Sequence, residues 1–149
     1  MEQTLVLLKP DALKRRLVGR IIRRIEDKGL RIAATKLMWL PRELAERHYS
    51  EHREKPFFQE LVRFITAGPL VAMVVEGDEA INIVRRLMGK TNPKQAEPGT
   101  IRGDFGLAVT CNLVHGSDSP ESARREIPLF FTREEILDYC MADAEWLGG

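Results

Sequence analysis

Apolar residues recur along the chain with two different spacings, and these predict strands and helices in alternation. Residues 4–8 form a nearly continuous apolar run followed by Lys9 and Pro10, which is typical of a buried strand that ends at a proline. Over residues 17–25 the apolar positions recur at helical spacing, and Gly29 follows shortly after. That segment is therefore expected to be a helix with one buried face and a glycine at its end.

The rest of the chain continues this alternation. The same patterns predict strands over 30–39 and 70–75, helices over 42–50, 56–66 and 78–88, and a fourth strand within 107–115. Ser119 and Pro120 suit the N-cap and the first position of a last helix. The order βαββαβ, with additional helices, fits a ferredoxin-like α+β sandwich. In that fold a four-stranded antiparallel sheet carries helices on one face.

Neither the composition nor the charge of the chain indicates a boundary between domains. Without a low-complexity linker or a repeat, residues 1–149 are expected to form one domain. The 23 basic and 22 acidic residues leave a formal charge of +1, so the net charge does not favour binding to nucleic acid or to an anionic membrane. The N-terminus lacks a signal-peptide pattern, and the longest apolar runs are too short to span a bilayer. We therefore expect a cytoplasmic protein without a membrane partner, with Cys111 and Cys140 as reduced thiols.

The segment with the clearest chemistry surrounds His115, at the end of the predicted fourth strand. Gly116 to Asp118 must turn tightly before the helix at Pro120, and Gly116 also allows another molecule to approach the backbone. An accessible neutral imidazole is a nucleophile, and a nearby carboxylate can fix its tautomer. Glu126 is the candidate carboxylate. Taken alone, a single histidine is more often a hydrogen-bonded structural residue, so the surrounding sequence decides between these interpretations.

Residues 112–118 read Asn-Leu-Val-His-Gly-Ser-Asp and resemble the active-site signature of nucleoside diphosphate kinases, Asn-x-x-His-Gly-Ser-Asp. Other segments resemble that family in its order and spacing, so that the resemblance covers essentially the whole chain: residues 9–11, 48–49, 53–58, 68–69, 89–93 and 98–105. The resemblance implies reversible transfer of the γ-phosphoryl group from a nucleoside triphosphate, such as ATP or GTP, to a nucleoside diphosphate. The implied mechanism is ping-pong, through phosphorylated His115.

The resemblance also implies a role for each functional position. It assigns catalytic roles to His115, Glu126, Ser117, Lys9 and Tyr49, and nucleotide binding to Lys9, Phe57, Leu61, Arg85, Thr91, Arg102, Val109 and Asn112. Glu126, steadied by Ser117, accepts a hydrogen bond from the second ring nitrogen of His115. The two arginines clamp phosphate oxygens, because a guanidinium fork offers parallel charged donors. Phe57 stacks on the base without reading its edges, so broad base and sugar tolerance is expected.

Two further expectations follow from the resemblance. Mg²⁺ arrives on the phosphates of the nucleotide, since the sequence shows no dedicated set of carboxylate ligands. The chain forms a homo-oligomer, for which a hexamer is favoured over a tetramer.

Three other interpretations compete with this function. His48 and His52 are spaced to share a metal on one helix face, but no third ligand is evident and a solvated face is the simpler interpretation. A run of basic residues could instead bind nucleic acid, although it also suits the wet face of an amphipathic helix: Lys14, Arg15, Arg16, Arg20, Arg23 and Arg24. An inactive nucleotide sensor of the same fold is the third alternative, and the intact residue set around His115 argues against it.

Overall fold

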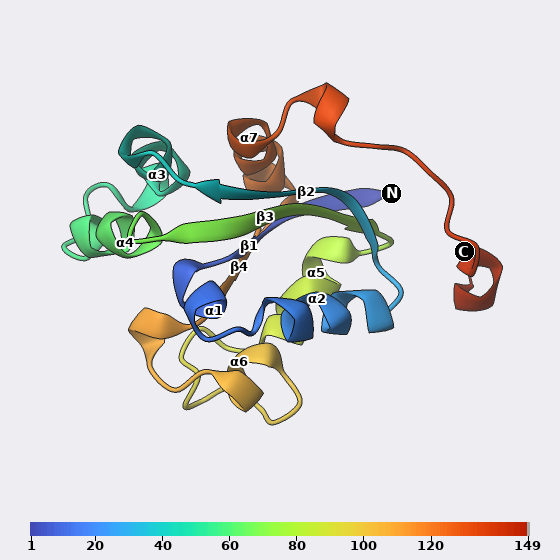
Figure 1. Ribbon diagram of the computed structural model, residues 1–149, viewed down its shortest axis with the longest axis horizontal. Helices are drawn as coiled ribbons and strands as arrows, with labels where there is room; N and C mark the ends of the chain where they lie inside the picture. The colour runs from blue at the N-terminus through green and yellow to red at the C-terminus, as the bar shows by residue number, and fades with distance from the viewer. Residues whose placement is uncertain (149) are drawn as a thin grey trace.

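The computed structural model describes residues 1–148 and has the expected order of elements (Figure 1). Only the last residue of the expected 1–149 domain lies outside the described residues. The strands are β1 (Glu2–Leu8), β2 (Arg31–Trp39), β3 (Pro69–Gly77) and β4 (Val114–Gly116). The α-helices are α1 (Pro10–Lys14), α2 (Val18–Asp27), α3 (Arg42–His48), α4 (Phe58–Ile65), α5 (Ala80–Met88), α6 (Ile101–Phe105) and α7 (Pro120–Phe130). No helix among these residues is long and apolar enough to cross a membrane.

The four strands form one sheet in the order β2-β3-β1-β4, and every neighbouring pair is antiparallel. This topology confirms the predicted ferredoxin-like α+β fold. β1 lies in the interior of the sheet, between β3 and β4. Because β1 and β4 are paired, residues more than a hundred positions apart in the sequence lie in contact.

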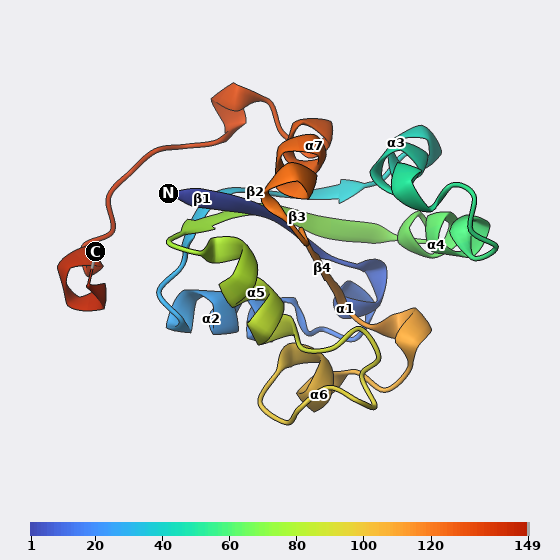
Figure 2. The ribbon, with the colours of Figure 1, turned by 180° about the vertical axis from the view of Figure 1, so that it is seen from behind.

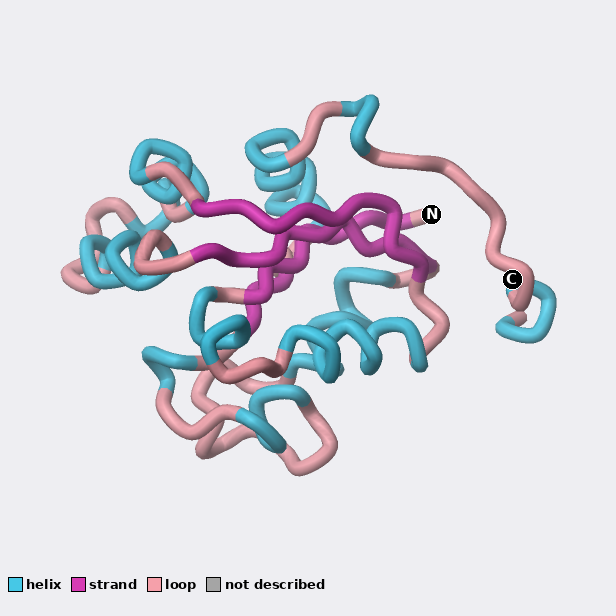
Figure 3. The backbone as a smooth tube through the Cα atoms, viewed as in Figure 1, coloured by secondary structure: helices cyan, strands magenta, loops and turns pink. Residues whose placement is uncertain are grey.

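Helices cover both faces of the sheet. Leu5 and Leu7 of β1 belong to a core cluster with α3, α4 and α7, whereas Val6 and Leu8 belong to a second cluster with α2 and α5. Figures 1 and 3 show α3 and α7 on one side of the sheet and α2 and α5 on the other. The sequence predicted helices on one face of the sheet, and α2 and α5 are these helices. The additional helices bury the opposite face. Because both faces are buried, β1 is apolar at consecutive positions rather than at alternate ones.

The fourth strand is much shorter than its predicted window of 107–115. β4 covers three residues, and a 3₁₀ turn, Val109–Cys111, precedes it. Leu113 interrupts regular pairing, because its φ of 74° lies in the left-handed region that bulky residues rarely adopt. Its N–H donates to the Asp11 carboxylate at 3.1 Å, and its carbonyl accepts from the Lys9 N–H at 2.8 Å. These two bonds hold the strained backbone beside the end of β1.

The register of β4 sets the direction of His115. His115 is paired with Leu7 of β1, so the two side chains project from the same face of the sheet. That face is covered by α3 and α7. α7 begins as predicted, because the Ser119 side chain accepts a hydrogen bond from the Ser122 N–H at 3.1 Å. α7 packs against β1, and Figure 2 shows it from behind on the same face of the sheet as α3.

Candidate active site

His115, Glu126 and Ser117 form one hydrogen-bonded group. The Nε2 atom of His115 lies 3.0 Å from the Oε1 atom of Glu126, and the Ser117 hydroxyl donates to that same oxygen at 2.8 Å. Ser117 is fully buried, and its oxygen also accepts from the Leu5 N–H at 3.1 Å. The serine therefore ties the carboxylate to the centre of the sheet. With Nε2 directed at a carboxylate, the His115 tautomer protonated on Nε2 leaves the lone pair on Nδ1.

Arg125 supports the carboxylate from its other side. Glu126 is buried, and its Oε2 atom lies 3.6 Å from Nη2 of Arg125. The same guanidinium donates to the carbonyls of Arg47 and His48, both at 3.4 Å. It also pairs with Glu51 at 3.4 Å. Arg125 thus fastens the end of α3 to α7 while compensating a buried negative charge.

Lys9 and Asn112 meet where β1 ends. The Lys9 ammonium donates to the Asn112 side-chain oxygen at 2.9 Å, and the Asn112 amide donates to the Thr91 carbonyl at 3.0 Å. Burial, helped by the charge of Arg102, lowers the pKa of Lys9 to about 8. A buried ammonium with one neutral acceptor is an incomplete arrangement, which an anion would complete.

Arg102 holds the backbone that precedes His115. Its guanidinium donates to the carbonyls of Gly89 at 3.0 Å, Asn112 at 3.1 Å and Val114 at 2.7 Å. Burial, followed by the charge of Arg85, lowers the pKa of Arg102 to about 10, so the side chain remains charged at neutral pH. Arg102 was predicted to bind the nucleotide. It also holds the backbone in place, a role that the sequence did not indicate.

The positive charges near His115 repel one another. The charge of Arg102 lowers the pKa of Lys9, and the charge of Arg85 lowers that of Arg102. Arg85 itself is exposed. Asp118 carries a negative charge nearby, with its pKa lowered first by a hydrogen bond from Ser122 and also by the charge of Arg85. The arrangement fits a bound chain of phosphates, which would relieve the repulsion between the cations.

The remaining predicted residues lie outside this hydrogen-bonded group. Tyr49 is buried, and burial followed by the charge of Glu126 raises the pKa of its hydroxyl. Phe57 and Val109 are 43% and 51% exposed, and Leu61 packs against the core cluster. Within the described part of the chain, no ring contact links Phe57 to His115. α4 and the 109–111 turn lie at the same end of the sheet (Figures 1 and 2).

The interpretation of His48 as part of a solvated helix face is wrong. His48 is 2% exposed, and its ring meets the His115 ring edge to face with centroids 4.6 Å apart. It also packs against the rings of Tyr49 and Phe130. Ala45 and His48, three positions apart, form the buried stripe of α3. That spacing was the available signal, but a histidine on a short helix does not by itself indicate which face is buried.

The close approach expected at Gly116 involves the protein itself. A methyl group at this position would lie 2.7 Å from the sulfur of Met88 and 3.2 Å from Cγ1 of Val84. Glycine therefore allows α5 to pack closely on β4. The approach of another molecule to this backbone stays a prediction.

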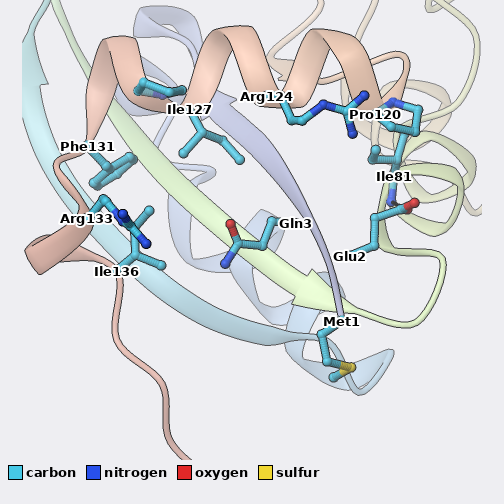
Figure 4. A pocket seen from close by; sticks show the side chains of 11 residues that line it. Met1, Glu2, Gln3, Ile81, Pro120, Arg124, Ile127, Phe131, Arg133 and Ile136 are labelled. Carbon is cyan, nitrogen blue, oxygen red and sulfur yellow. Dashed lines mark hydrogen bonds between the residues drawn. The ribbon is translucent and has the colours of Figure 1, made fainter.

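A groove of about 710 Å³ lies beside α7, apart from the group around His115 (Figure 4). It is lined by the start of β1 and by side chains that include Ile127, Phe131 and Ile136. Glu126, the residue before Ile127, is not part of its wall. None of the predicted site residues lines this groove, so its size does not identify it as the active site.

The chain is similar to known proteins over nearly its whole length. The sequence model of the family described as nucleoside diphosphate kinase matches residues 2–136. A nucleoside diphosphate kinase of Archaeoglobus fulgidus is 60% identical over 147 residues, which are 99% of this chain and 97% of that protein. One from Listeria monocytogenes is 58% identical over 99% of this chain and 100% of its own length. The structure of a halophilic nucleoside diphosphate kinase from Halobacterium salinarum in complex with CDP superposes with a TM-score of 0.96 at 48% identity, covering 98% of this chain and 97% of that one. The chain therefore belongs to the nucleoside diphosphate kinase family, and its activity is that of a nucleoside diphosphate kinase.

Proposed function

We propose that the chain transfers phosphoryl groups between nucleotides through a phosphate carried on Nδ1 of His115. The observation that carries this proposal is the pairing of Nε2 with Glu126 at 3.0 Å, which leaves Nδ1 as the nucleophilic nitrogen. The site residues predicted from the sequence supply the other groups that such a transfer needs. Phosphoryl transfer depends mainly on alignment and on compensation of negative charge.

In the first half-reaction the Nδ1 lone pair forms a bond to the γ-phosphorus as the bond from that phosphorus to the bridging oxygen breaks. The electron pair of the broken bond stays on the departing nucleoside diphosphate. Phosphorylation leaves the imidazole ring of His115 positively charged, with its remaining proton on Nε2. Glu126, held by Ser117, stabilises that charge through its existing hydrogen bond. A second diphosphate then takes the group by the reverse of these events.

Lys9, Arg85 and Arg102 would hold the phosphate oxygens. Lys9 is buried next to Asn112, and both would contact the transferred phosphate and the sugar hydroxyl. Thr91 is exposed and adds a hydroxyl donor. Tyr49, buried against His48, would support this end of the site. Binding of the phosphate chain would replace repulsion between cations with charge-assisted hydrogen bonds.

The base would lie at the exposed end of the site. Phe57 offers a partly exposed ring face, and Val109 and Leu61 offer apolar surface. Stacking recognises a ring face and not the donors and acceptors on base edges. The bound CDP of the Halobacterium relative supports nucleotide binding by this chain. We accordingly propose broad tolerance of bases and sugars.

Mg²⁺ is part of the substrate in this proposal. Magnesium prefers oxygen ligands and keeps several waters. The groups beside His115 are mostly cationic or nitrogen donors, which do not fit a protein site for Mg²⁺. We therefore propose that the ion enters on the nucleotide phosphates, where it offsets their charge.

Assembly and location remain part of the proposal. Leu37 and Trp39 on the edge strand β2, and Trp146 near the C-terminus, are 67%, 64% and 81% exposed. We take these exposed apolar side chains as support for a homo-oligomer, for which we favour a hexamer over a tetramer. Cys111 and Cys140 are both unpaired, as is usual in the cytoplasm.

The alternative of a nucleic-acid-binding basic run finds little support. Arg24 pairs with Asp104 at 2.6 Å and donates to the Gly99 carbonyl at 2.9 Å. Arg23 pairs with Asp27 at 3.3 Å. Two of the six basic residues in the run are thus paired with carboxylates of the protein itself, as is usual on the polar face of a helix.

The test is isolation of the phosphorylated protein. The chain is incubated with γ-labelled ATP and Mg²⁺, freed from nucleotide, and assayed for label that is acid-labile and base-stable. Alkaline hydrolysis followed by separation of the phosphohistidine isomers should place the phosphate on Nδ1. His115→Ala should carry no label, whereas His52→Ala should be labelled as wild type. Label on Nε2, or stable label on His115→Ala, would contradict the mechanism.

A further inference from the structure

His48 joins His115 and Glu126 in a cluster of three metal-ligating side chains. Each residue offers one ligand atom, and these atoms all lie within 4.8 Å of one another. The three residues come from α3, β4 and α7, so only the folded chain brings them together. This is not the His48–His52 pair considered from the sequence, since His48 is directed at His115.

The two ring nitrogens of His48 have no hydrogen-bond partner, although the ring is almost fully buried. Neither Nδ1 nor Nε2 finds a donor or acceptor among the described residues. A buried polar group without a partner is costly, and such exceptions are often explained by an unrecognised ligand. One of these nitrogens lies within 4.8 Å of the ligand atoms of His115 and Glu126. The cluster therefore contains a ligand atom of His48 that no hydrogen bond within the protein uses.

The donor set selects the kind of ion. Two imidazoles and one carboxylate are typical ligands of Zn²⁺ in sites that keep a fourth position open, whereas Mg²⁺ requires oxygen ligands. In a tetrahedral zinc site neighbouring ligand atoms lie roughly 3.3 Å apart, so the farthest pair must approach by roughly 1.5 Å. The His115–Glu126 pair already has a separation of 3.0 Å. The inward movement therefore falls mainly on His48.

Nearby charges affect the cluster in opposite ways. Arg125 lies 3.6 Å from the Oε2 atom of Glu126, and its positive charge disfavours a cation here. The Glu126 carboxylate belongs to the cluster itself, and its negative charge favours a cation.

We propose that His48, His115 and Glu126 bind Zn²⁺ and that this ion inhibits phosphoryl transfer. The inhibitory consequence rests on the proposed role of His115, whereas metal binding does not. An ion bound between Nε2 of His115 and Glu126 takes the place of the ring proton, which moves to Nδ1, so that Nδ1 no longer has a lone pair for the phosphorus atom. The ion also adds positive charge beside an imidazole that becomes positive when it is phosphorylated. Zn²⁺ and the phosphoryl group therefore each disfavour the binding of the other at His115.

Binding is measured first, on the intact protein without nucleotide, because nucleotides also bind Zn²⁺. Competition with a chromophoric chelator gives the Zn²⁺ affinity, and absorption of bound Co²⁺ reports nitrogen and oxygen ligands. His48→Gln should weaken binding at least about tenfold, whereas His52→Gln, a matched histidine on the next turn, should bind as wild type. If His48→Gln unfolds, Glu126→Gln tests the same site. Equal affinity of wild type and a folded His48→Gln or Glu126→Gln variant would overturn the proposal.

The consequence is measured on formation of the phosphohistidine. Substoichiometric Zn²⁺ should slow labelling of wild type and of His52→Gln to similar extents but have little effect on His48→Gln. Protein already phosphorylated on His115 should bind Zn²⁺ at least about tenfold more weakly than the unphosphorylated chain. Unchanged labelling of zinc-loaded wild type would overturn the inhibition. Absence of label on the zinc-free protein, given ATP and Mg²⁺, would instead refute the proposed function, which keeps the two failures distinct.

Discussion

The Nε2 atom of His115 and the Oε1 atom of Glu126 lie 3.0 Å apart, although the residues belong to different elements, β4 and α7. Ser117 donates to the same oxygen at 2.8 Å. The carboxylate is therefore fixed in place before any charge develops on the imidazole. Such preorganisation stabilises a transition state without a cost of reorientation during the reaction.

Replacing the carboxylate by an amide tests this relationship. Glu126→Gln keeps the shape of the side chain but removes the negative charge, and it should slow phosphorylation of His115 by about 100-fold. The rate of labelling from γ-labelled ATP in a single turnover measures the effect. Glu121→Gln changes an exposed residue in the first turn of the same helix and should leave the rate unchanged. Equal losses in both variants would mean that helix charge, and not the contact with His115, matters.

The sequence predicted the sheet, the order of elements and the contacts of Glu126 with His115 and Ser117. It could do so because β1 is a continuous apolar run, because α2 has a strong helical period, and because Ser119 and Pro120 mark the start of α7 clearly. It did not predict the burial of His48, which depends on α3 packing against α7. Nor could it predict the positive φ of Leu113, which is held by hydrogen bonds to residues about a hundred positions earlier. Local pattern carries no information about partners that distant.

The lowered pKa of Lys9 makes nucleotide binding depend on pH. Burial holds this pKa at about 8, so the side chain loses its positive charge as pH rises through that value. The dissociation constant of a nucleoside diphosphate should therefore increase above about pH 8, while an arginine, which stays charged, should flatten the profile. Calorimetric titration of wild type and Lys9→Arg from pH 7 to pH 10 checks this. Parallel profiles would assign the dependence to another group.

The same burial predicts an opposite effect on stability. The folded pKa of Lys9 is about 8 against an ordinary 10.5, so between these values the unfolded chain binds more protons than the folded one. The free energy of unfolding should thus rise as the pH increases from about 8 to about 10.5. Below pH 8 the buried charge of Lys9 destabilises the folded protein to its full extent. Lys9→Met removes the buried charge and should stabilise the apo protein at pH 7 by up to roughly 3 kcal/mol while weakening nucleotide binding. Urea unfolding at pH 7 and pH 10 measures both variants, and a Lys9→Met protein less stable than wild type at pH 7 would refute the assignment.

Phe57 should contribute equally to the binding of all bases. Its ring is 43% exposed, and stacking on an aromatic face is worth about 1–3 kcal/mol for any base. Phe57→Ala should raise the dissociation constants of adenine, guanine and cytosine nucleotides by similar factors, about 5- to 150-fold. Titration with the three diphosphates measures this. Phe57→Trp is the conservative control and should retain affinity, and a loss confined to one base would show that its edge is being read.

Gly116 tests a packing contact beside the catalytic residue. It follows His115 in the sequence, but it packs against α5. An added methyl group would lie 2.7 Å from the Met88 sulfur, so Gly116→Ala should lower the free energy of unfolding by about 1–3 kcal/mol. Met88→Leu removes the sulfur at little cost by itself, since it conserves volume in the core. If the clash is the cause, the double variant should recover much of the loss, and the coupling energy between the two sites should be clearly stabilising. Urea unfolding of the wild type, both single variants and the double variant gives that coupling. Additive losses would mean that Gly116 is required for another reason, such as the turn that carries Ser117 back to Glu126.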